Sequence, residues 1–247
     1  MKILTIDIET KPHLVWKWDL YDKQIVPTDM VVEPGGMICF AAKWMGDQAE
    51  PVFRSVFHDG YADMVATTWT LLNTADAVTT YNGNKFDSPR MNREFSTYGF
   101  RPPSPYKRID LYRVVRKVFG FPSNKLDYVC QELGIGAKVK HEGFGLWRQC
   151  MADDVAAWDR MREYNIHDVE LTEQLFKVLL PWISDLPSYG AETGEAVCPA
   201  CGSSDLRKEG HAYTRTGRYQ RYVCRDCDTW SRATRRDMST GITQVAA

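Results

Sequence analysis

Asp7 and Glu9 lie two residues apart in a segment that is otherwise rich in isoleucine. The alternation of a β-strand would point both carboxylates to the same face. Two carboxylates side by side repel each other unless a cation lies between them. The pair therefore indicates a metal site, although a strand end whose acids face water has the same pattern.

A third acidic position, Asp87, follows a segment that contains an Asn-Gly pair, Thr80–Phe86. The apolar residues before this pair predict a short buried strand, and the pair itself predicts a turn. A helix is expected from Ser88, with Pro89 in its first turn. Asp87 can cap that helix, ligate a metal, or do both.

The fourth acidic position, Asp168, lies four residues after Tyr164 in the longest predicted helix. Residues at this spacing share one face of a helix. Leu171, Leu175 and Leu179 continue the same face, so it is expected to be buried. A buried carboxylate needs a partner or a metal. An Arg or Lys partner for Asp168 and a core position for Tyr164 both stay open.

Taken together, the three segments resemble the motifs of DEDD (DnaQ-like) exonucleases of the ribonuclease H-like superfamily. Asp7-Ile8-Glu9-Thr10 is similar to the first motif and the segment from Asn82 to Asp87 to the second, in the form of family-B DNA polymerase proofreading domains. Tyr164-x-x-x-Asp168 matches the tyrosine version of the third motif. The resemblance covers about residues 1–180 and implies 3′→5′ exonuclease activity.

The resemblance also implies that two Mg²⁺ or Mn²⁺ ions, which prefer carboxylate oxygens, assist phosphodiester hydrolysis. Asp7 would bridge the two ions. Glu9 and Asp168 would complete the site of the attacking water, and Asp87 would act at the leaving group. Tyr164 would orient the water.

Three further residues are expected to contact the substrate: Thr10, Asn82 and Phe86. Phe86 would stack on the terminal nucleotide or belong to the core. Single-stranded DNA is the favoured substrate, and RNA stays open because the same kind of site cleaves both. A structure-specific or transposase-like nuclease and a non-catalytic module that binds nucleic acid stay open as well.

Two C-x-x-C pairs near the C-terminus are separated by 22 residues: Cys198 with Cys201, and Cys224 with Cys227. This spacing is a strong signature of one structural Zn²⁺ held by four thiolates. The intervening segment is too short for a core of its own, so metal would supply the folding energy. The segment is similar to the zinc ribbons of transposases and other nucleic-acid enzymes.

Residues 207–236 contain nine Lys or Arg against three acidic residues, in a chain whose net charge is −1. Aromatic rings alternate with these cations, which suits phosphates and unstacked bases of a single strand. The residues expected to bind nucleic acid here are Arg215, Arg218, Arg221 and Tyr222. Docking of a replication or repair protein is the competing interpretation.

The elements that must position these groups are strands that come first and then alternate with helices. Strands are predicted over residues 2–8, 37–45, 51–56 and 77–80, and helices over 61–72, 88–98, 109–118, 126–133 and 153–180. This order predicts an α/β fold, and the resemblance implies a ribonuclease H-like mixed sheet flanked by helices. The expected parts are an exonuclease domain (1–183), a linker (184–196), a zinc ribbon (197–234) and a disordered tail (235–247).

A chain of 247 residues, 44% of them hydrophobic, can bury a core without disulfides. No apolar run approaches the roughly 20 residues that span a bilayer. The N-terminal residues lack the features of a signal peptide. These observations predict a cytoplasmic protein without membrane contact.

Overall fold

The structure is a computed structural model that describes residues 1–19 and 25–239. It divides into two compact units. One comprises residues 2–176, and the other comprises residues 177–247 together with Met1. The longest helix, α6 (Val155–Leu179), begins in the first unit and ends in the second.

A five-stranded mixed sheet forms the centre of the first unit. Its strands, in spatial order, are β5 (Val52–Ser55), β4 (Met37–Trp44), β1 (Ile3–Thr10), β6 (Ala77–Thr80) and β7 (Lys107–Asp110). β5, β4 and β1 are antiparallel neighbours, whereas β1, β6 and β7 run parallel. The carboxyl ends of these three parallel strands therefore meet at one edge of the sheet.

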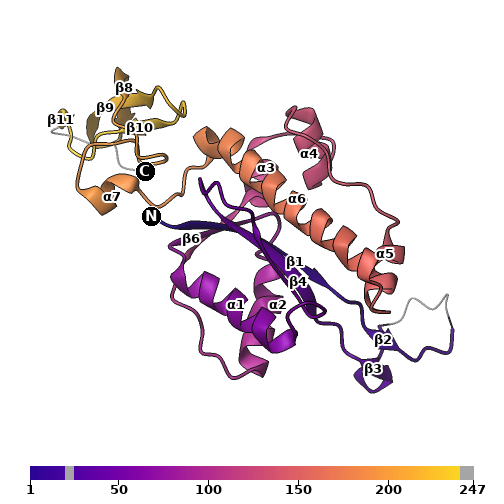
Figure 1. Ribbon diagram of the computed structural model, residues 1–247. Helices are drawn as coiled ribbons and strands as arrows, with labels where there is room; N and C mark the ends of the chain where they lie inside the picture. The colour runs from indigo at the N-terminus through magenta and orange to yellow at the C-terminus, as the bar shows by residue number, and fades with distance from the viewer. Residues whose placement is uncertain (20–24, 240–247) are drawn as a thin grey trace, which may run out of the picture. The chain divides into compact units, whose positions relative to one another are not determined.

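The two faces of β1 serve different purposes because its side chains alternate. Leu4, Ile6 and Ile8 are buried in a cluster with apolar residues of α1 (Tyr61–Thr74) and α2 (Asp87–Thr97). The other face of the sheet packs against α5 (Phe144–Cys150) and α6 through a second buried cluster. Helices thus cover both faces of the sheet (Figure 1). Asp7 and Glu9 of β1 lie on the face that α6 covers.

Smaller elements complete this unit. They are β2 (Leu14–Val15), η1 (Thr28–Met30), β3 (Val31–Glu33), α3 (Leu111–Val118) and α4 (Leu126–Glu132). The β2–β3 ribbon carries exposed apolar side chains, including Leu14 and Val32. Among the described residues, no helix has the length and apolar character needed to cross a bilayer.

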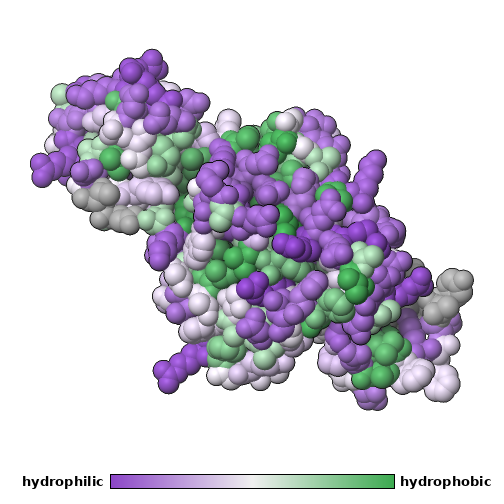
Figure 2. Space-filling view, in the orientation of Figure 1, coloured by the Kyte–Doolittle hydropathy of each residue, from purple (hydrophilic) through white to green (hydrophobic). Residues whose placement is uncertain are grey.

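The second unit contains a short 3-10 helix, η2 (Leu180–Trp182), the helix α7 (Tyr189–Thr193) and a four-stranded sheet. The strands are β8 (Leu206–Thr214), β9 (Gly217–Cys224), β10 (Trp230–Arg232) and β11 (Met238–Ser239). β9 pairs antiparallel with each of the other three. The surface over these strands is mainly hydrophilic (Figure 2).

The mixed sheet flanked by helices confirms the predicted fold class. Two local predictions are wrong, and one of the alternatives left open for Asp87 is excluded. The helix predicted over 109–118 begins at Leu111, because Ile109 and Asp110 belong to β7. The side chain of Asp87 does not cap α2, because α2 starts at Asp87 itself. The tail predicted to be disordered includes β11, and residues 240–247 lie outside the described residues.

Candidate active site and cysteine cluster

Asp7 and Glu9 meet Asp168 on the face of the sheet that α6 covers. One carboxylate oxygen from each of the three lies within 4.8 Å of the others. The side-chain amide of Asn165, on α6, donates to Oδ2 of Asp7 at 2.7 Å and to the Asp7 carbonyl at 3.3 Å. The strand and the helix predicted to carry these acids therefore lie against each other, and the three carboxylates converge. Asn165 is a contact that no pattern in the sequence identified.

One oxygen of Asp168 could bind a metal ion while the other forms an ion pair. Its side chain is almost fully buried, and its Oδ1 atom has no hydrogen-bond partner in the described part of the chain. A buried carboxylate oxygen without a partner is costly unless a cation or a water fills its place. The donor set of Asp7, Glu9 and Asp168 consists of carboxylates, which suits Mg²⁺ or Mn²⁺.

Asp87 lies beside this group but not within it. Its Oδ1 accepts the backbone N–H of Ile8 at 3.2 Å, which links the start of α2 to β1. Asp87 is close enough to Asp7 for the two charges to repel each other. The structure therefore places three of the predicted acidic ligands together and the fourth at a neighbouring position.

Lost hydration and mutual repulsion raise the pKa values of these carboxyl groups. Asp7 and Glu9 keep some accessible surface, but the sheet and α6 displace much of their hydration. Desolvation followed by repulsion from Asp168 raises the pKa of Glu9 to about 8. Desolvation raises the pKa of Asp87 to about 7, and it also raises the pKa values of Asp7 and Asp168. Four adjacent carboxylates thus require cations to be fully charged near neutral pH.

Lys138 supplies one cation. Its ammonium group forms an ion pair with Oδ2 of Asp168 and donates to the hydroxyl of Tyr164 at 3.2 Å. Its backbone N–H donates to Oδ1 of Asp127 at 2.7 Å, which fixes the loop that carries it. No spacing in the sequence marks this lysine as a partner of Asp168. The lysine partner that the sequence left open for Asp168 is present, and it leaves Oδ1 free.

Tyr164 is buried and also packs as a core side chain. The rings of His141 and Trp147 meet it edge-on, with centroids 4.7 Å and 6.0 Å from its own. These contacts hold the phenol ring while its hydroxyl faces Lys138. The two interpretations of Tyr164, core residue and polar site residue, are therefore compatible.

The turn after β6 is fixed by Asp110, at the end of β7. The two carboxylate oxygens accept the backbone N–H groups of Asn82 and Asn84 at 2.9 and 3.2 Å. Asn82 has a φ of 66°, and a Cβ at Gly83 would lie 2.3 Å from Oγ1 of Thr80. Only glycine fits this close approach, which explains the Asn-Gly pair.

The other two predicted substrate contacts lie beside this turn and at the end of β1. Phe86 packs partly against the apolar core, and the guanidinium of Arg90 lies 3.7 Å from its ring centroid. Thr10 follows a register shift in β1 and lines a pocket of about 330 Å³ that Arg90 and Arg93 also line. Neither residue belongs to the group of three acids.

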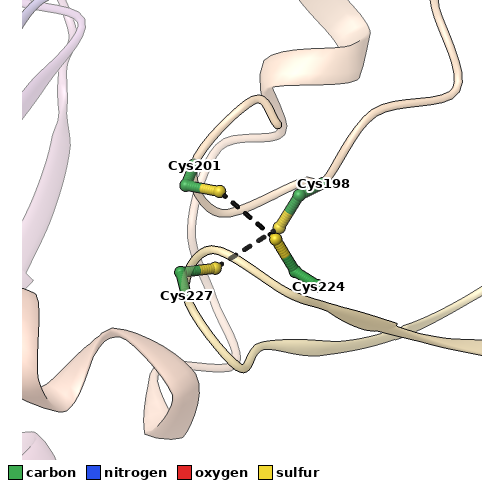
Figure 3. A group of neighbouring side chains, drawn as sticks. All are labelled: Cys198, Cys201, Cys224 and Cys227. Carbon is green, nitrogen blue, oxygen red and sulfur yellow. Dashed lines mark hydrogen bonds between the residues drawn. The ribbon is translucent and has the colours of Figure 1, made fainter. Parts of the chain in front are cut away.

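The four C-terminal cysteines converge from two turns (Figure 3). Cys198 and Cys227 have their sulfur atoms 3.6 Å apart, as do Cys201 and Cys224, and all four sulfurs lie within 4.8 Å of one another. A tetrahedral zinc ion with bonds of about 2.3 Å separates its sulfur ligands by roughly 3.8 Å. The cysteines therefore fit one zinc ion.

The basic residues predicted to bind nucleic acid in this unit do not share one face of β9. Arg218 and Tyr222 are four residues apart, whereas Arg221 falls on the opposite face by strand alternation. The guanidinium of Arg221 lies 4.7 Å from the ring centroid of Trp230 and donates to the Glu209 carbonyl. Arg215 lies in the turn between β8 and β9. One flat surface cannot contact all four predicted residues.

The fold agrees with comparisons to known proteins. The model of the RNase_H superfamily matches residues 29–180. Among solved structures, a family B DNA polymerase from the hyperthermophilic archaeon Pyrobaculum calidifontis is similar, with a TM-score of 0.56 and 16% identity. The similarity covers 87% of this chain but only 31% of the polymerase, and at this identity it concerns the fold. No curated protein matches the chain.

We expect Lys138→Met to lower the midpoint of thermal unfolding in EDTA, because the substitution removes a cation from among buried carboxylates. A loss of about 2 kcal/mol corresponds to roughly 5 °C for a chain of this size. Added Mn²⁺ should then raise the midpoint more than in the unsubstituted protein, since the more negative site binds the ion more tightly.

Differential scanning calorimetry measures both effects. The exposed Lys140, two residues away, provides the matched control Lys140→Met, which should behave like the unsubstituted protein. An equal response to Mn²⁺ in all three proteins would contradict the role of Lys138 as a counter-cation.

Proposed function

The chain belongs to the RNase H superfamily, and on that premise we propose that it is a metal-dependent 3′→5′ exonuclease acting on single-stranded DNA. Membership in this superfamily supports a nuclease that uses divalent metals. The observation that carries the proposal is the convergence of Asp7, Glu9 and Asp168 within 4.8 Å, with Asp87 beside them. The exonuclease mode and its polarity follow from the resemblance of the three motifs.

Two Mg²⁺ or Mn²⁺ ions, when bound, would make a water more nucleophilic and stabilise the leaving 3′ oxygen. Asp7 is suited to be the shared ligand, because its charge interacts with those of all three other acids. Asn165 fixes the orientation of that carboxylate through Oδ2. Glu9, beside Asp7 on β1, and Asp168, on α6, would hold the ion that activates the water, and Asp87 would act at the leaving group.

The role assigned to Tyr164 is to orient the attacking water. Burial, followed by the nearby charges of Asp168 and Glu9, raises the pKa of its phenol above the ordinary value. The phenol therefore stays neutral at physiological pH and acts as a hydrogen-bonding group, not as a base. Because Lys138 donates to the phenol oxygen, the phenolic proton is available to a carboxylate or to a water.

We propose that the cysteine cluster holds one structural zinc ion and that the surrounding zinc ribbon contacts nucleic acid. Four thiolates would close the coordination shell, so this ion would take no part in hydrolysis. Arg218 and Tyr222 share one face of β9 and are the better candidates for that contact, since Arg221 is engaged by Trp230.

The substitution Asp7→Ala tests the nuclease proposal. It removes the shared ligand, so hydrolysis should fall by about 10³-fold or more. The assay uses 3′-labelled and 5′-labelled single-stranded DNA, RNA and duplex, each with Mg²⁺, Mn²⁺ or EDTA. The unsubstituted protein should release mononucleotides from the 3′ end in either metal and be inert in EDTA.

The matched control is Asp63→Ala, which removes an exposed carboxylate from α1 and should leave the rate unchanged. Near-normal turnover by Asp7→Ala would contradict the assigned metal site. Release of nucleotides from the 5′ end would contradict the proposed polarity. Cleavage of RNA alone would contradict DNA as the substrate.

Tyr164→Phe should reduce the rate of hydrolysis by roughly 10–10³-fold, less than the loss of any carboxylate. The ring contacts with His141 and Trp147 can persist in phenylalanine, so stability should change little. The affinity for Mn²⁺ should also be nearly unchanged, because the phenol is not a proposed ligand. Full activity in this variant would leave Tyr164 as a core residue only.

Elemental analysis of the protein purified without chelators should find about one zinc ion per chain. Cys198→Ser should lose this zinc, because three thiolates no longer close the shell. The matched control is Cys39→Ser, which changes a cysteine outside the cluster. Retention of zinc by Cys198→Ser, or its absence from the unsubstituted protein, would contradict the zinc assignment.

A further inference from the structure

A basic groove runs along the first unit from the acidic cluster to α3. It consists of two pockets of about 510 and 420 Å³ that share Asn82 and Tyr112 as lining residues. Lys138 lines the larger pocket and also forms the ion pair with Asp168. One end of the groove therefore lies at the proposed catalytic centre.

Six cations from separate segments line this groove: Lys85, Arg113, Arg116, Lys117, Lys125 and Lys138. The cations of α3 alone would be an ordinary complement to the dipole at the end of that helix. Lys85 comes instead from the turn after β6, and Lys125 from the segment that precedes α4. Convergence from unconnected segments indicates a surface that recognises a polyanion.

The two acidic residues that line the groove are outnumbered by its six cations, and both direct oxygens to backbone N–H groups. Asp110 directs its oxygens to the backbone N–H groups of Asn82 and Asn84. Asp127 accepts the backbone N–H of Lys138. Both carboxylates are thus used to hold the walls of the groove, and the cations of α3 and Lys85 are left on the exposed side.

The rings of Tyr81 and Tyr112 meet edge-on in the wall, with centroids 5.9 Å apart, and the guanidinium of Arg116 lies 5.7 Å from the Tyr112 centroid. Cations for phosphates beside aromatic rings for bases are the combination that binds single strands. We propose that this groove binds the sugar-phosphate backbone of a nucleic-acid strand whose end is held at the acidic cluster. The proposal deepens the nuclease function and rests on it for the position of that end.

Replacing Arg113 and Arg116 by Gln tests the groove in the full chain. Each phosphate contact to a single strand contributes about 0.7 to the slope of log affinity against log salt. The double variant should therefore lower the slope by roughly 1.4 and weaken binding about 10-fold at low salt. Fluorescence anisotropy in EDTA measures binding of oligothymidylate and oligouridylate of about 20 nucleotides.

The matched control replaces Arg101 and Arg162, two exposed arginines of the same unit outside the groove, by Gln. This variant has the same net charge and should keep the original slope. A slope and affinity equal to the control for both strands would overturn the proposal. A loss for both strands supports phosphate recognition, and a loss for one supports the groove with that nucleic acid as its occupant.

Circular dichroism and the midpoint of thermal unfolding verify that both double variants fold. Because binding is measured without metal, the result does not depend on hydrolysis. A chain that cleaved no substrate would disprove the nuclease proposal and leave the measured slopes valid. Unchanged slopes in a chain that does cleave would disprove the groove alone.

Discussion

The repulsion among four carboxylates at one site is the constraint on which the rest of the structure depends. Removing a charge from water costs several kcal/mol unless a partner compensates it. The fold supplies such partners from separate elements: the amide of Asn165, the backbone N–H of Ile8 and the ammonium of Lys138. Oδ1 of Asp168 still lacks a partner in the described structure. The arrangement is therefore one that divalent cations would stabilise.

The topology of the sheet explains why these groups meet. β1, β6 and β7 are parallel neighbours, so the residues at their carboxyl ends reach the same edge. That edge holds Glu9, the turn at Asn82 and Asp110. α6 then crosses the face of β1 and adds Asn165 and Asp168. The site is therefore assembled from groups on several separate elements of the fold.

Local patterns in the sequence predicted the groups whose positions depend on strand or helix periodicity. Asp7 and Glu9 on one face of a strand follow from an alternation of two, and Tyr164 with Asp168 from a spacing of four. The two cysteines of each C-x-x-C pair were predicted to lie together because one tight turn holds both. For these residues the sequence contains the geometric information, because neighbours in space are also close in the chain.

Contacts between distant segments could not be predicted in the same way. Lys138 lies 30 residues before its partner Asp168, in a loop without periodicity. The pattern around Asp87 left helix capping and metal ligation open, and it did not reveal that Oδ1 accepts the backbone N–H of Ile8, 79 residues away. Asp110 was assigned to a helix because the four-residue strand that contains it is too short to show alternation.

The basic groove follows from the same electrostatic constraint. An acidic cluster repels phosphates, so a nucleic-acid strand is held near it only where neighbouring cations outweigh that repulsion. Divalent ions would reduce the repulsion at the cluster itself but act over a short range at physiological salt. Phosphates farther along a bound strand would need fixed positive charge, and the exposed cations of α3 and Lys85 would provide it on the same unit. The proposed binding groove and the proposed catalytic site thus place opposite charges side by side, and Lys138 belongs to both, because it lines the groove and pairs with Asp168.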